Sequence, residues 1–438
     1  MRPAPKKVHV ITLGCSKNTV DSEVLLHQLR EEGFDVDHDA PEIRGGTVII
    51  NTCGFIRDAQ AESVDTILYF AEARKKGLID RLIVMGCLVE RFREELKKEI
   101  PEADAWYGVH EMEQVVRDAG ANFHYELLTR RHLTTPSHYA YLKISEGCSR
   151  KCAFCSIPAI RGKHRSRPVE EILDEAEWLA SRGVKEVMLI AQDLTWYGRD
   201  LYGQQRLPEL VDRLSQLPFR WIRLHYAYPS GFPTEIIPLM KERENICHYL
   251  DIPFQHISDR VLKKMRRGST SGTIRRLVQR LRKEIPDIAL RTTFLVGHPA
   301  ETEKDFRELL EFIEETRFDR LGVFAYSHEE GTYAWRHYRD TIPEKVKQER
   351  VGEVMTLQER IAEEINEKRV GEILPVILDR REGTFWTGRT QYDSPEVDQE
   401  VLIPAKGADE KRKPGDFVRV KIVRADGFDL YGEITGRA

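Results

Sequence analysis

The fold is decided by GCSRKCAFC, residues 147–155, in which Cys148, Cys152 and Cys155 form a C-x-x-x-C-x-x-C run. Thiolates this close in sequence are placed to share one metal centre. A structural zinc site usually has a fourth protein ligand, and no nearby residue supplies one at a suitable spacing. Iron–sulfur cubanes are normally held by four thiolates, so three would leave one iron open to a small molecule. The run predicts a reactive iron–sulfur site, with a zinc or disulfide knuckle as the alternative.

The composition of the 438-residue chain, 41% hydrophobic and 32% charged, is typical of a globular protein with two or three domains. The apolar stretch after the basic N-terminus is short and contains His9 and Thr12, which predicts a strand and not a signal peptide. No run reaches the roughly 18 apolar residues that span a bilayer, so no membrane partner is expected. Seven cysteines, an odd number, indicate a reducing compartment, and we expect a cytoplasmic protein. The formal net charge of −4 gives no overall attraction to nucleic acid.

In the N-terminal third of the chain, strand-like and helix-like stretches alternate. Strand-like stretches cover residues 8–13, 47–51 and 81–85, and helix-like stretches cover residues 22–32, 59–76 and 90–99. This alternation predicts a doubly wound α/β domain with a mostly parallel sheet. Cys15, Cys53 and Cys87 each follow one of the three strands, beside a glycine. Since the carboxyl ends of parallel strands line the ligand crevice, the three cysteines can converge on a second cluster. The alternative is three separate buried thiols.

The middle of the chain predicts six more strands with helices between them. The strands cover residues 141–145, 186–191, 221–225, 248–252, 289–296 and 321–325, and the clearest helices cover residues 169–181, 207–217 and 303–316. Six βα units are too few for a closed eight-stranded barrel, so we expect an open (βα)6 partial barrel. Active sites on such scaffolds lie at the carboxyl ends of the strands.

Those strand ends carry polar residues within otherwise apolar sequence. They are Gln192, Asp193, His225, Asp251, Gln255, His256, Thr292 and Thr293. Singly, each is expected to be a satisfied polar group, but their agreement at several strand ends predicts a ligand-lined mouth. His256 is equally compatible with contact to a substrate or cofactor and with hydrogen-bonded packing. Thr302, followed by Asp305, predicts a helix N-cap, and Cys247 predicts a core thiol.

A charged helix over residues 343–369 leads to a tail of different composition. Short strand-like stretches cover residues 373–378, 384–389, 400–403, 417–422 and 430–434, broken by Gly, Pro and Asp. Five short strands predict a small oligonucleotide-fold-like β-barrel. Acidic and basic residues nearly balance in this tail, apart from a local basic group at Lys411, Arg412 and Lys413. The balance suits a basic protein partner better than a phosphate backbone.

The cysteine run, including the aromatic Phe154 before its last cysteine, resembles the signature of the radical S-adenosylmethionine superfamily. That resemblance implies that Cys148, Cys152 and Cys155 hold a 4Fe–4S cluster whose open iron binds S-adenosylmethionine. Reductive cleavage of this cofactor would then give an adenosyl radical that removes hydrogen from unactivated carbon. The protein would supply binding, orientation and exclusion of water.

Further motifs resemble the methylthiotransferases over essentially the whole chain. They are TLGCSKN at 12–18, NTCGF at 51–55, GC at 86–87, LDIPFQH at 250–256, GHPAET at 297–302 and the TRAM-like tail. The resemblance implies a second 4Fe–4S cluster on Cys15, Cys53 and Cys87. It also implies three domains, at residues 1–125, 134–368 and 370–438. We expect no catalytic side chain beyond the two clusters. The residues expected to contact S-adenosylmethionine are Phe154, Gln192, Asp193, Gln255, His256, Thr293 and Glu301.

Two branches of the methylthiotransferases differ in substrate. GCSKNTVDSE at 14–23 and YSHEEGT at 326–332 are similar to the RimO family, which modifies the β-carbon of an aspartate in the twelfth small-subunit ribosomal protein. The sister branch modifies adenosine of transfer RNA and usually has Arg-Pro where this chain has Glu329 and Glu330. Two acids there would repel a phosphate and suit the basic loop of a ribosomal protein. The motifs therefore favour the ribosomal branch.

The resemblance also implies partners. They are the twelfth small-subunit ribosomal protein, free or in the 30S subunit, an electron donor such as flavodoxin, and a sulfur donor. Contact with nucleic acid is expected to be secondary. The alternatives are methylthiolation of transfer RNA, and a non-catalytic iron–sulfur protein that binds the ribosome or RNA.

Overall fold

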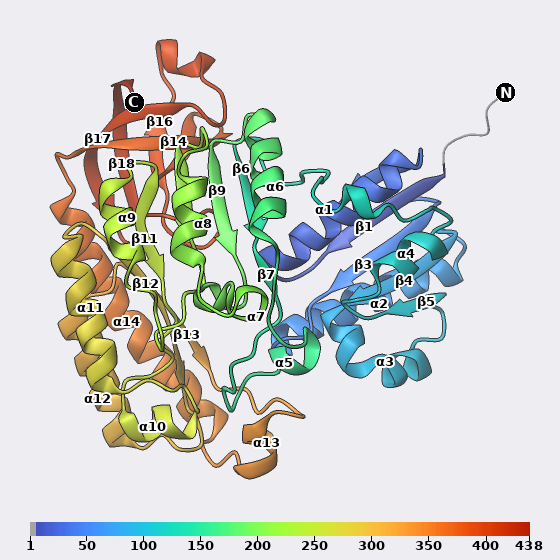
Figure 1. Cartoon of the computed structure of the whole chain (residues 1–438), viewed down its shortest axis with the longest axis horizontal. Coiled ribbons are helices and arrows are strands. Elements are labelled where there is room, and N and C mark those ends of the chain that lie inside the picture. The colour runs from blue at the N-terminus through green and yellow to red at the C-terminus, as the bar shows by residue number, and fades with distance from the viewer. Residues whose placement is uncertain (1–5) are drawn as a thin grey trace. The chain divides into compact units, whose positions relative to one another are not determined.

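The computed structural model describes residues 6–438, apart from the side chains of residues 408 and 410 (Figure 1). The chain forms two compact units. The first contains the residues up to 134 together with 141–150 and 155–178, and the second contains 135–140, 151–154 and 179–438. No helix within residues 6–438 is long and apolar enough to cross a membrane.

The first unit contains a five-stranded sheet with the strand order β2-β1-β3-β4-β5. Every pairing in this sheet is parallel. The strands are β1 (Lys7–Thr12), β2 (Asp35–His38), β3 (Thr47–Thr52), β4 (Arg81–Gly86) and β5 (Ala105–Tyr107). The helices are α1 (Ser16–Glu31), α2 (Arg57–Lys75), α3 (Cys87–Glu99) and α4 (Met112–Asp118). This order is that of a doubly wound sheet whose direction of winding reverses between β1 and β3.

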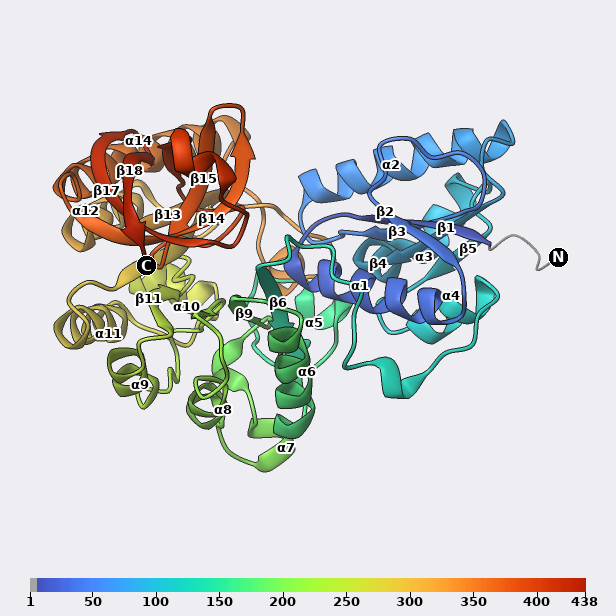
Figure 2. The same cartoon turned by 90° about the horizontal axis from the view of Figure 1, so that it is seen from above.

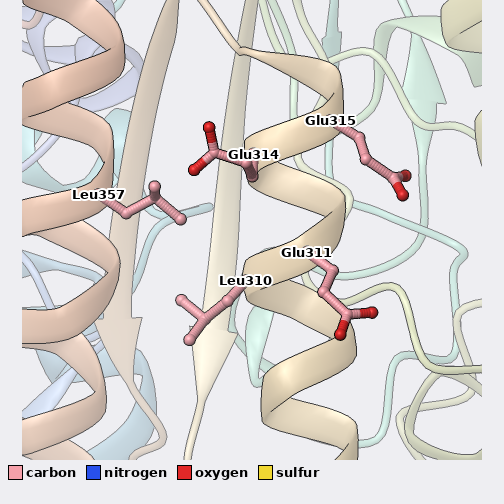
Figure 3. A pocket seen from close by; sticks show the side chains of 5 residues that line it. All are labelled: Leu310, Glu311, Glu314, Glu315 and Leu357. Atoms are coloured by element: carbon pink, nitrogen blue, oxygen red, sulfur yellow. The ribbon is translucent and has the colours of Figure 1, made fainter.

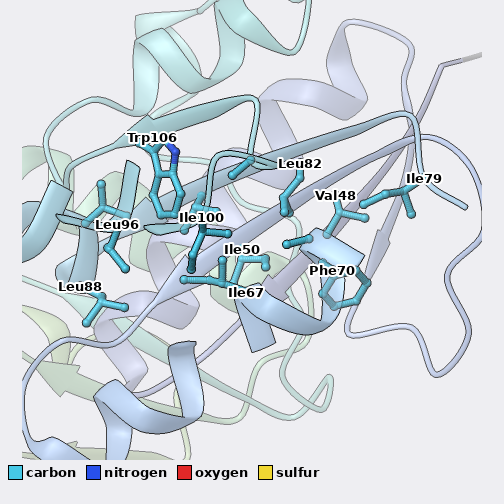
Figure 4. Packing of buried hydrophobic residues seen from close by; sticks show 14 residues of the cluster. Val48, Ile50, Ile67, Phe70, Ile79, Leu82, Leu88, Leu96, Ile100 and Trp106 are labelled. Carbon is cyan, nitrogen blue, oxygen red and sulfur yellow. The ribbon is translucent and has the colours of Figure 1, made fainter. Parts of the chain in front are cut away.

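Two apolar cores cover the two faces of this sheet. On one face, α2 and α3 pack against β3 and β4, with Phe70, Leu88 and Trp106 at the contact (Figure 4). On the other face, α1 and α4 pack against β1, with Leu25 and Val115 at the contact. Figure 2 shows α1 and α2 on opposite sides of the sheet. The predicted doubly wound domain is confirmed.

Sequence patterns missed the two edge strands, β2 and β5. The sequence of β2 is DVDH, with no buried residue, and β5 has only three residues. Neither shows the apolar run of a central strand, so only pairing in the sheet reveals them. Helix α1 also begins six residues earlier than its expected start at Ser22, because its first turns bury polar side chains such as Asn18.

The central sheet has six strands in the order β13-β12-β11-β10-β9-β6, and the pairings between neighbours from β9 to β13 are all parallel. Its strands are β6 (Tyr139–Lys143), β9 (Glu186–Ile190), β10 (Trp221–Leu224), β11 (Ile246–Asp251), β12 (Ala289–Val296) and β13 (Arg320–Ala325). Strand neighbours follow chain order, as the predicted open partial barrel requires. The helices are α6 (Val169–Ser181), α7 (Arg199–Tyr202), α8 (Leu207–Leu214), α9 (Ile236–Glu242), α10 (Asp259–Lys264), α11 (Ser271–Glu284), α12 (Glu303–Thr316) and α13 (Tyr333–His337).

The predicted N-cap of α12 is confirmed, because Thr302 and Asp305 form a reciprocal capping box. Cys247 is confirmed as a core thiol, packed with Trp221 and Tyr249. Its burial raises the pKa of the thiol to about 12.

Helix α14 (Glu344–Lys368) leads to a closed barrel with the strand order β14-β15-β16-β18-β17. Its strands are β14 (Ile373–Glu382), β15 (Phe385–Thr390), β16 (Val401–Pro404), β17 (Phe417–Asp426) and β18 (Asp429–Arg437). The predicted C-terminal β-barrel is therefore confirmed. Within the second unit, Arg389 of this barrel donates to Glu186 of β9 at 2.8 Å, and Arg223 of β10 donates to the same carboxylate at 2.8 Å. All three side chains are buried, which fixes the small barrel against the central sheet.

Candidate active site

Cys15, Cys53 and Cys87 lie at the carboxyl ends of three neighbouring strands, β1, β3 and β4. Backbone packing is close here. A Cβ atom at Gly14, where φ is +94°, would lie 2.9 Å from the sulfur of Cys53, and one at Gly54 would lie 2.7 Å from the carbonyl of Cys87. The absence of these two side chains leaves the sulfur atoms room to approach one another. The three thiols, 38 and 34 residues apart in sequence, thus stand at neighbouring strand ends and within electrostatic range of one another.

Two of these cysteines also begin helices. Cys15 is the N-cap of α1, and Cys87 is the first residue of α3. The positive end of a helix dipole lies at such a position. Burial raises the pKa of Cys53 and raises the pKa of Cys87 to about 12. A bound iron would supply the charge that keeps buried thiols deprotonated, so this donor set fits an iron–sulfur cluster.

The cysteine run forms a loop whose stem is a short antiparallel pair, β7 (Ser145–Glu146) and β8 (Arg165–Ser166), with the short helix α5 (Ile157–Ile160) between them. The amide of Cys148 donates to the carbonyl of Gly162 at 3.0 Å. Cys148 and Cys155 are partly exposed and belong to the same compact unit as the three N-terminal cysteines. Partial exposure leaves these sulfurs accessible to a cluster.

Arg161, near the end of this loop, joins it to helix α1 within the first unit. Its guanidinium donates to Asp21 at 2.9 Å, to Glu146 at 3.1 Å and to the amide oxygen of Asn18. Arg161 is not predicted by the sequence, since one arginine in a basic loop has no distinguishing local pattern.

Cys152 lies in the second unit, beside two groups that the sequence analysis also missed. Its sulfur is 3.3 Å from Nη1 of Arg267 and 3.4 Å from the hydroxyl of Tyr228. The guanidinium of Arg267 stacks 4.1 Å from the centre of the Tyr228 ring, and Tyr228 donates to the carbonyl of Arg267 at 2.7 Å. The buried guanidinium of Arg267 therefore places a positive charge directly beside this sulfur.

Backbone strain marks the ends of two neighbouring central strands. Tyr226, two residues beyond β10, has φ +61°, and Gln255, four residues beyond β11, has φ +73°. The amide of Tyr226 donates to the side chain of Asp251 at 3.1 Å, and the amide of Gln255 donates to the carbonyl of Thr293 at 2.8 Å. Non-glycine residues in this conformation are costly and concentrate at functional sites. These bonds therefore identify the mouth of the partial barrel as a constrained region.

Other expected strand-end residues have local structural contacts. Asp193 accepts hydrogen bonds from the amide and the hydroxyl of Thr195, at 2.9 and 2.6 Å. Phe154 packs against a small apolar group that includes Ala153, Tyr326 and Ala334. Gln192 is partly buried and lies two residues after the end of β9. These contacts do not test a role in cofactor binding, which stays a prediction.

His256 and Glu301 lie together, away from solvent. Nε2 of His256 is 3.4 Å from Oε2 of Glu301, and Nδ1 of His256 accepts from the amide of Ser258 at 3.0 Å. Glu301 also accepts from Arg350 of α14 at 2.7 Å and from the amide of Gly297 at 3.0 Å. The histidine is fully buried, so this arrangement provides the packing contacts that were one of its two expected roles.

Two grooves on the described surface lie elsewhere. One, between α12 and α14, is lined by Leu310, Glu311, Glu314, Glu315 and Leu357 (Figure 3). Two of its acids are paired, Glu314 with Arg360 and Glu315 with Arg275. The second groove is lined by α11 and α12 residues. Neither contains an expected site residue.

Within residues 6–438, no three His, Cys, Asp or Glu side chains converge as ligands of a single metal ion. The arrangement therefore differs from a closed zinc site, in which four ligands meet at one ion. Thiolates of an iron–sulfur cube bind different iron atoms and need not converge on one point.

Comparisons with known proteins identify the class. Residues 142–313 match the family model of the radical SAM superfamily, residues 7–108 match uncharacterized protein family UPF0004, and residues 370–435 match the TRAM domain. A solved radical S-adenosylmethionine methyltransferase, TsrM from Kitasatospora setae, shares the fold with a TM-score of 0.55 and 15% identity, over 86% of this chain and 79% of that chain. The cysteine loop and the partial barrel thus define a radical S-adenosylmethionine protein.

Two relatives identify the family. Ribosomal protein uS12 methylthiotransferase RimO from Porphyromonas gingivalis is 56% identical, over 98% of this chain and 99% of the relative. The protein of the same name from Parabacteroides distasonis is 54% identical, with the same coverage. The chain belongs to the RimO family of methylthiotransferases.

Proposed function

We propose that this protein is a radical S-adenosylmethionine methylthiotransferase that adds a methylthio group to the β-carbon of an aspartate in ribosomal protein uS12. The observation that carries the proposal is the identity of 56% with a named uS12 methylthiotransferase along nearly the whole of both chains. The placement of Cys15, Cys53 and Cys87 at the ends of three neighbouring strands supports it, because a methylthiotransferase needs a second cluster besides the radical one.

The cofactors of this family are S-adenosylmethionine and two 4Fe–4S clusters. We assign one cluster to Cys148, Cys152 and Cys155 and the other to Cys15, Cys53 and Cys87. When bound, the first cluster and S-adenosylmethionine supply the one-electron chemistry that activates the substrate carbon, and the second supplies a site for sulfur.

The residues around the cysteines give them charge and position. Arg267 and Tyr228 hold the sulfur of Cys152, and Arg267 places a positive charge beside it. The loop containing Cys148 is closed by its hydrogen bond to Gly162. Strained residues Tyr226 and Gln255 keep the strand ends in one conformation, which suits a mouth that must orient its ligands. We retain Phe154, Gln192, Asp193, Gln255, His256, Thr293 and Glu301 as proposed contacts of S-adenosylmethionine.

We also propose the location, partners and domain boundaries expected from the sequence. They are the cytoplasmic location, the flavodoxin-like electron donor, the sulfur donor, and recognition of uS12 either free or within the 30S subunit. The domain boundaries at residues 1–125, 134–368 and 370–438 also belong here. Limited proteolysis with mass mapping would test the boundaries.

The decisive experiment offers two substrates to the same enzyme. Anaerobically reconstituted protein receives S-adenosylmethionine, sulfide and a strong reductant, together with uS12 and unmodified transfer RNA. We expect one methylthio group on an aspartate peptide of uS12, read by mass spectrometry. A methylthio group on the RNA alone would show that the substrate assignment is wrong. Failure to cleave S-adenosylmethionine at all would favour a non-catalytic iron–sulfur protein.

A further inference from the structure

Arg161 is a buried cation that no expected function accounts for. Its side chain is 3% exposed, and it lies six residues after Cys155, the last cysteine of the run. The guanidinium nevertheless contacts helix α1, which starts directly after Cys15. Arg161, which belongs to the loop that contains Cys148 and Cys155, thus lies beside the helix that follows Cys15.

Asn18 connects Arg161 to all three N-terminal cysteines. Its amide nitrogen donates to the carbonyl of Leu13 at 2.7 Å and to that of Thr52 at 3.1 Å, on the backbone just before Cys15 and Cys53. Its amide oxygen accepts from Arg161 and lies 4.0 Å from the sulfur of Cys87. Arg161 therefore fixes the side chain that holds the two strand ends and faces the third cysteine.

Two acids hold the guanidinium in this position. Asp21 and Glu146 both pair with Arg161, and both also pair with Lys143. The four charges of this group balance, so the buried arginine is stabilised without a further counter-ion. Its Nη2 edge remains directed at Asn18, whose amide oxygen faces the sulfur of Cys87.

We propose that Arg161 is a positioning residue of the N-terminal cluster, and that its positive charge raises the reduction potential of that cluster. This proposal rests on the proposed function, because it needs a cluster on Cys15, Cys53 and Cys87. A fixed positive charge near a cluster stabilises the reduced state, which carries one more negative charge. Hydrogen bonds and charges outside the ligands are known means of tuning a metal site. The loop that holds the radical cluster thereby also supplies Arg161 to the site of the N-terminal cluster.

The test isolates the N-terminal cluster in the full chain. Cys148, Cys152 and Cys155 are replaced by alanine, so that reconstituted protein should hold about four irons. In this background we compare Arg161→Met, which removes the charge, with Arg161→Lys, which keeps it. Midpoint potentials are measured by redox titration followed by electron paramagnetic resonance, and melting of the iron-free protein checks the fold. We expect a lower potential for R161M and a potential close to the parent for R161K.

Arg165→Met is the matched control, since Arg165 is an exposed arginine of the same loop that contacts His110 instead. We expect its potential to be unchanged. Loss of iron from R161M but not from R161K would also support the charge effect. An unchanged potential in R161M, an equal shift in R165M, or loss of iron from both Arg161 variants would overturn it. The potential does not depend on uS12. A shift in this background, together with a wild-type protein that cleaves S-adenosylmethionine without modifying uS12, would refute the proposed substrate and leave this inference intact.

Discussion

At the scale of single residues, buried cysteines have two different environments. Cys87 begins a helix, faces Asn18 and lies in the electrostatic field of Arg161. Cys247 packs among aromatic and aliphatic side chains of the central sheet and the C-terminal barrel, and it also lies in the field of buried Arg223. Burial raises the pKa of both thiols to about 12, so burial alone does not separate a ligand from a core thiol. Three features distinguish Cys87 from Cys247: other cysteines lie nearby, it begins a helix, and its sulfur faces the side-chain amide of Asn18.

Substitution of these two cysteines tests that distinction. Reconstituted wild-type protein should hold about eight irons per chain, and Cys87→Ala should hold about four, because one cluster loses a ligand. Cys247→Ala is the matched control and should keep about eight. Iron analysis and the visible absorption spectrum give the answer. An equal loss in C247A, or full iron content in C87A, would contradict the assignment of the N-terminal cluster.

His298 gives a prediction for the dependence of stability on pH. It packs against Tyr326 and Tyr338, and burial lowers the pKa of its imidazole to about 3. The unfolded chain binds a proton at this residue below about pH 6.5, whereas the folded protein does not until about pH 3. This histidine therefore favours unfolding progressively as the pH falls from 6.5 towards 3. Between pH 6.5 and 5 the effect is about 1–2 kcal/mol.

We expect His298→Phe to lose less stability than the wild type between pH 7 and pH 5, measured by urea unfolding at each pH. His337→Phe is the control, because that side chain is exposed on α13. A wild-type pH dependence retained in H298F would show that other groups cause it.

At the scale of elements, the start of a helix is predicted best where the sequence contains a capping residue. The start of α12 is fixed by Thr302, whose hydroxyl accepts from the amide of Asp305, while Asp305 accepts from the amide of Thr302 at 2.8 Å. Asp305 is also bound by Ser258 and Arg260, and these hydrogen bonds hold its pKa below the ordinary value. By contrast, α1 begins at Ser16, and its N-cap residue Cys15 makes no capping hydrogen bond with its side chain. Its start was therefore placed too late.

Removing the cap of α12 should have a modest cost. Thr302→Ala leaves amides of the first turn without their acceptor and should lower the free energy of unfolding by about 1 kcal/mol. Thr302→Ser retains the hydroxyl and should stay close to the wild type. Chemical denaturation of the two variants provides the comparison, and equal losses would point to the methyl group instead of the cap.

At the scale of the whole molecule, the C-terminal barrel is joined to the central sheet by buried charges. Arg389 pairs with Glu186 and Asp379, and Asp379 also accepts from His138 at 2.8 Å. The two arginines near Glu186 hold the pKa of that carboxyl below its ordinary value, although burial opposes them. The small barrel is therefore fixed to the central sheet inside the second unit by specific ion pairs.

Breaking this group should destabilise the second unit strongly. Arg389→Met leaves two buried carboxylates without their shared partner, and we expect a loss of about 3–5 kcal/mol. Arg380→Met is the control, because Arg380 pairs with Glu400 near the surface and such pairs contribute about 0–1 kcal/mol. Urea unfolding followed by tryptophan fluorescence reports both. Similar small losses in the two variants would show that the buried group does not hold the barrel.

Sequence patterns alone determined the cysteine sets, the order of the three folds and most central strands. These features depend on local spacing: three cysteines in one short run, apolar periods of two or 3.6, and glycines after strands. The expected bounds of β12 agree with the structure at both ends, as do those of α6 and α12. Such elements follow from neighbouring residues because their own side chains fix them.

Only the tertiary structure decided which side chains meet. Arg161 and Asn18 are 143 residues apart, and Arg267 and Cys152 are 115 apart, so no local pattern relates either pair. The edge strands β2 and β5 and the strained backbone at Gln255 likewise depend on partners that are distant in sequence. The sequence determines where the thiols stand along the chain. Packing of helices on a twisted sheet determines which charges surround them, because burial and Coulombic interaction depend on distance in space.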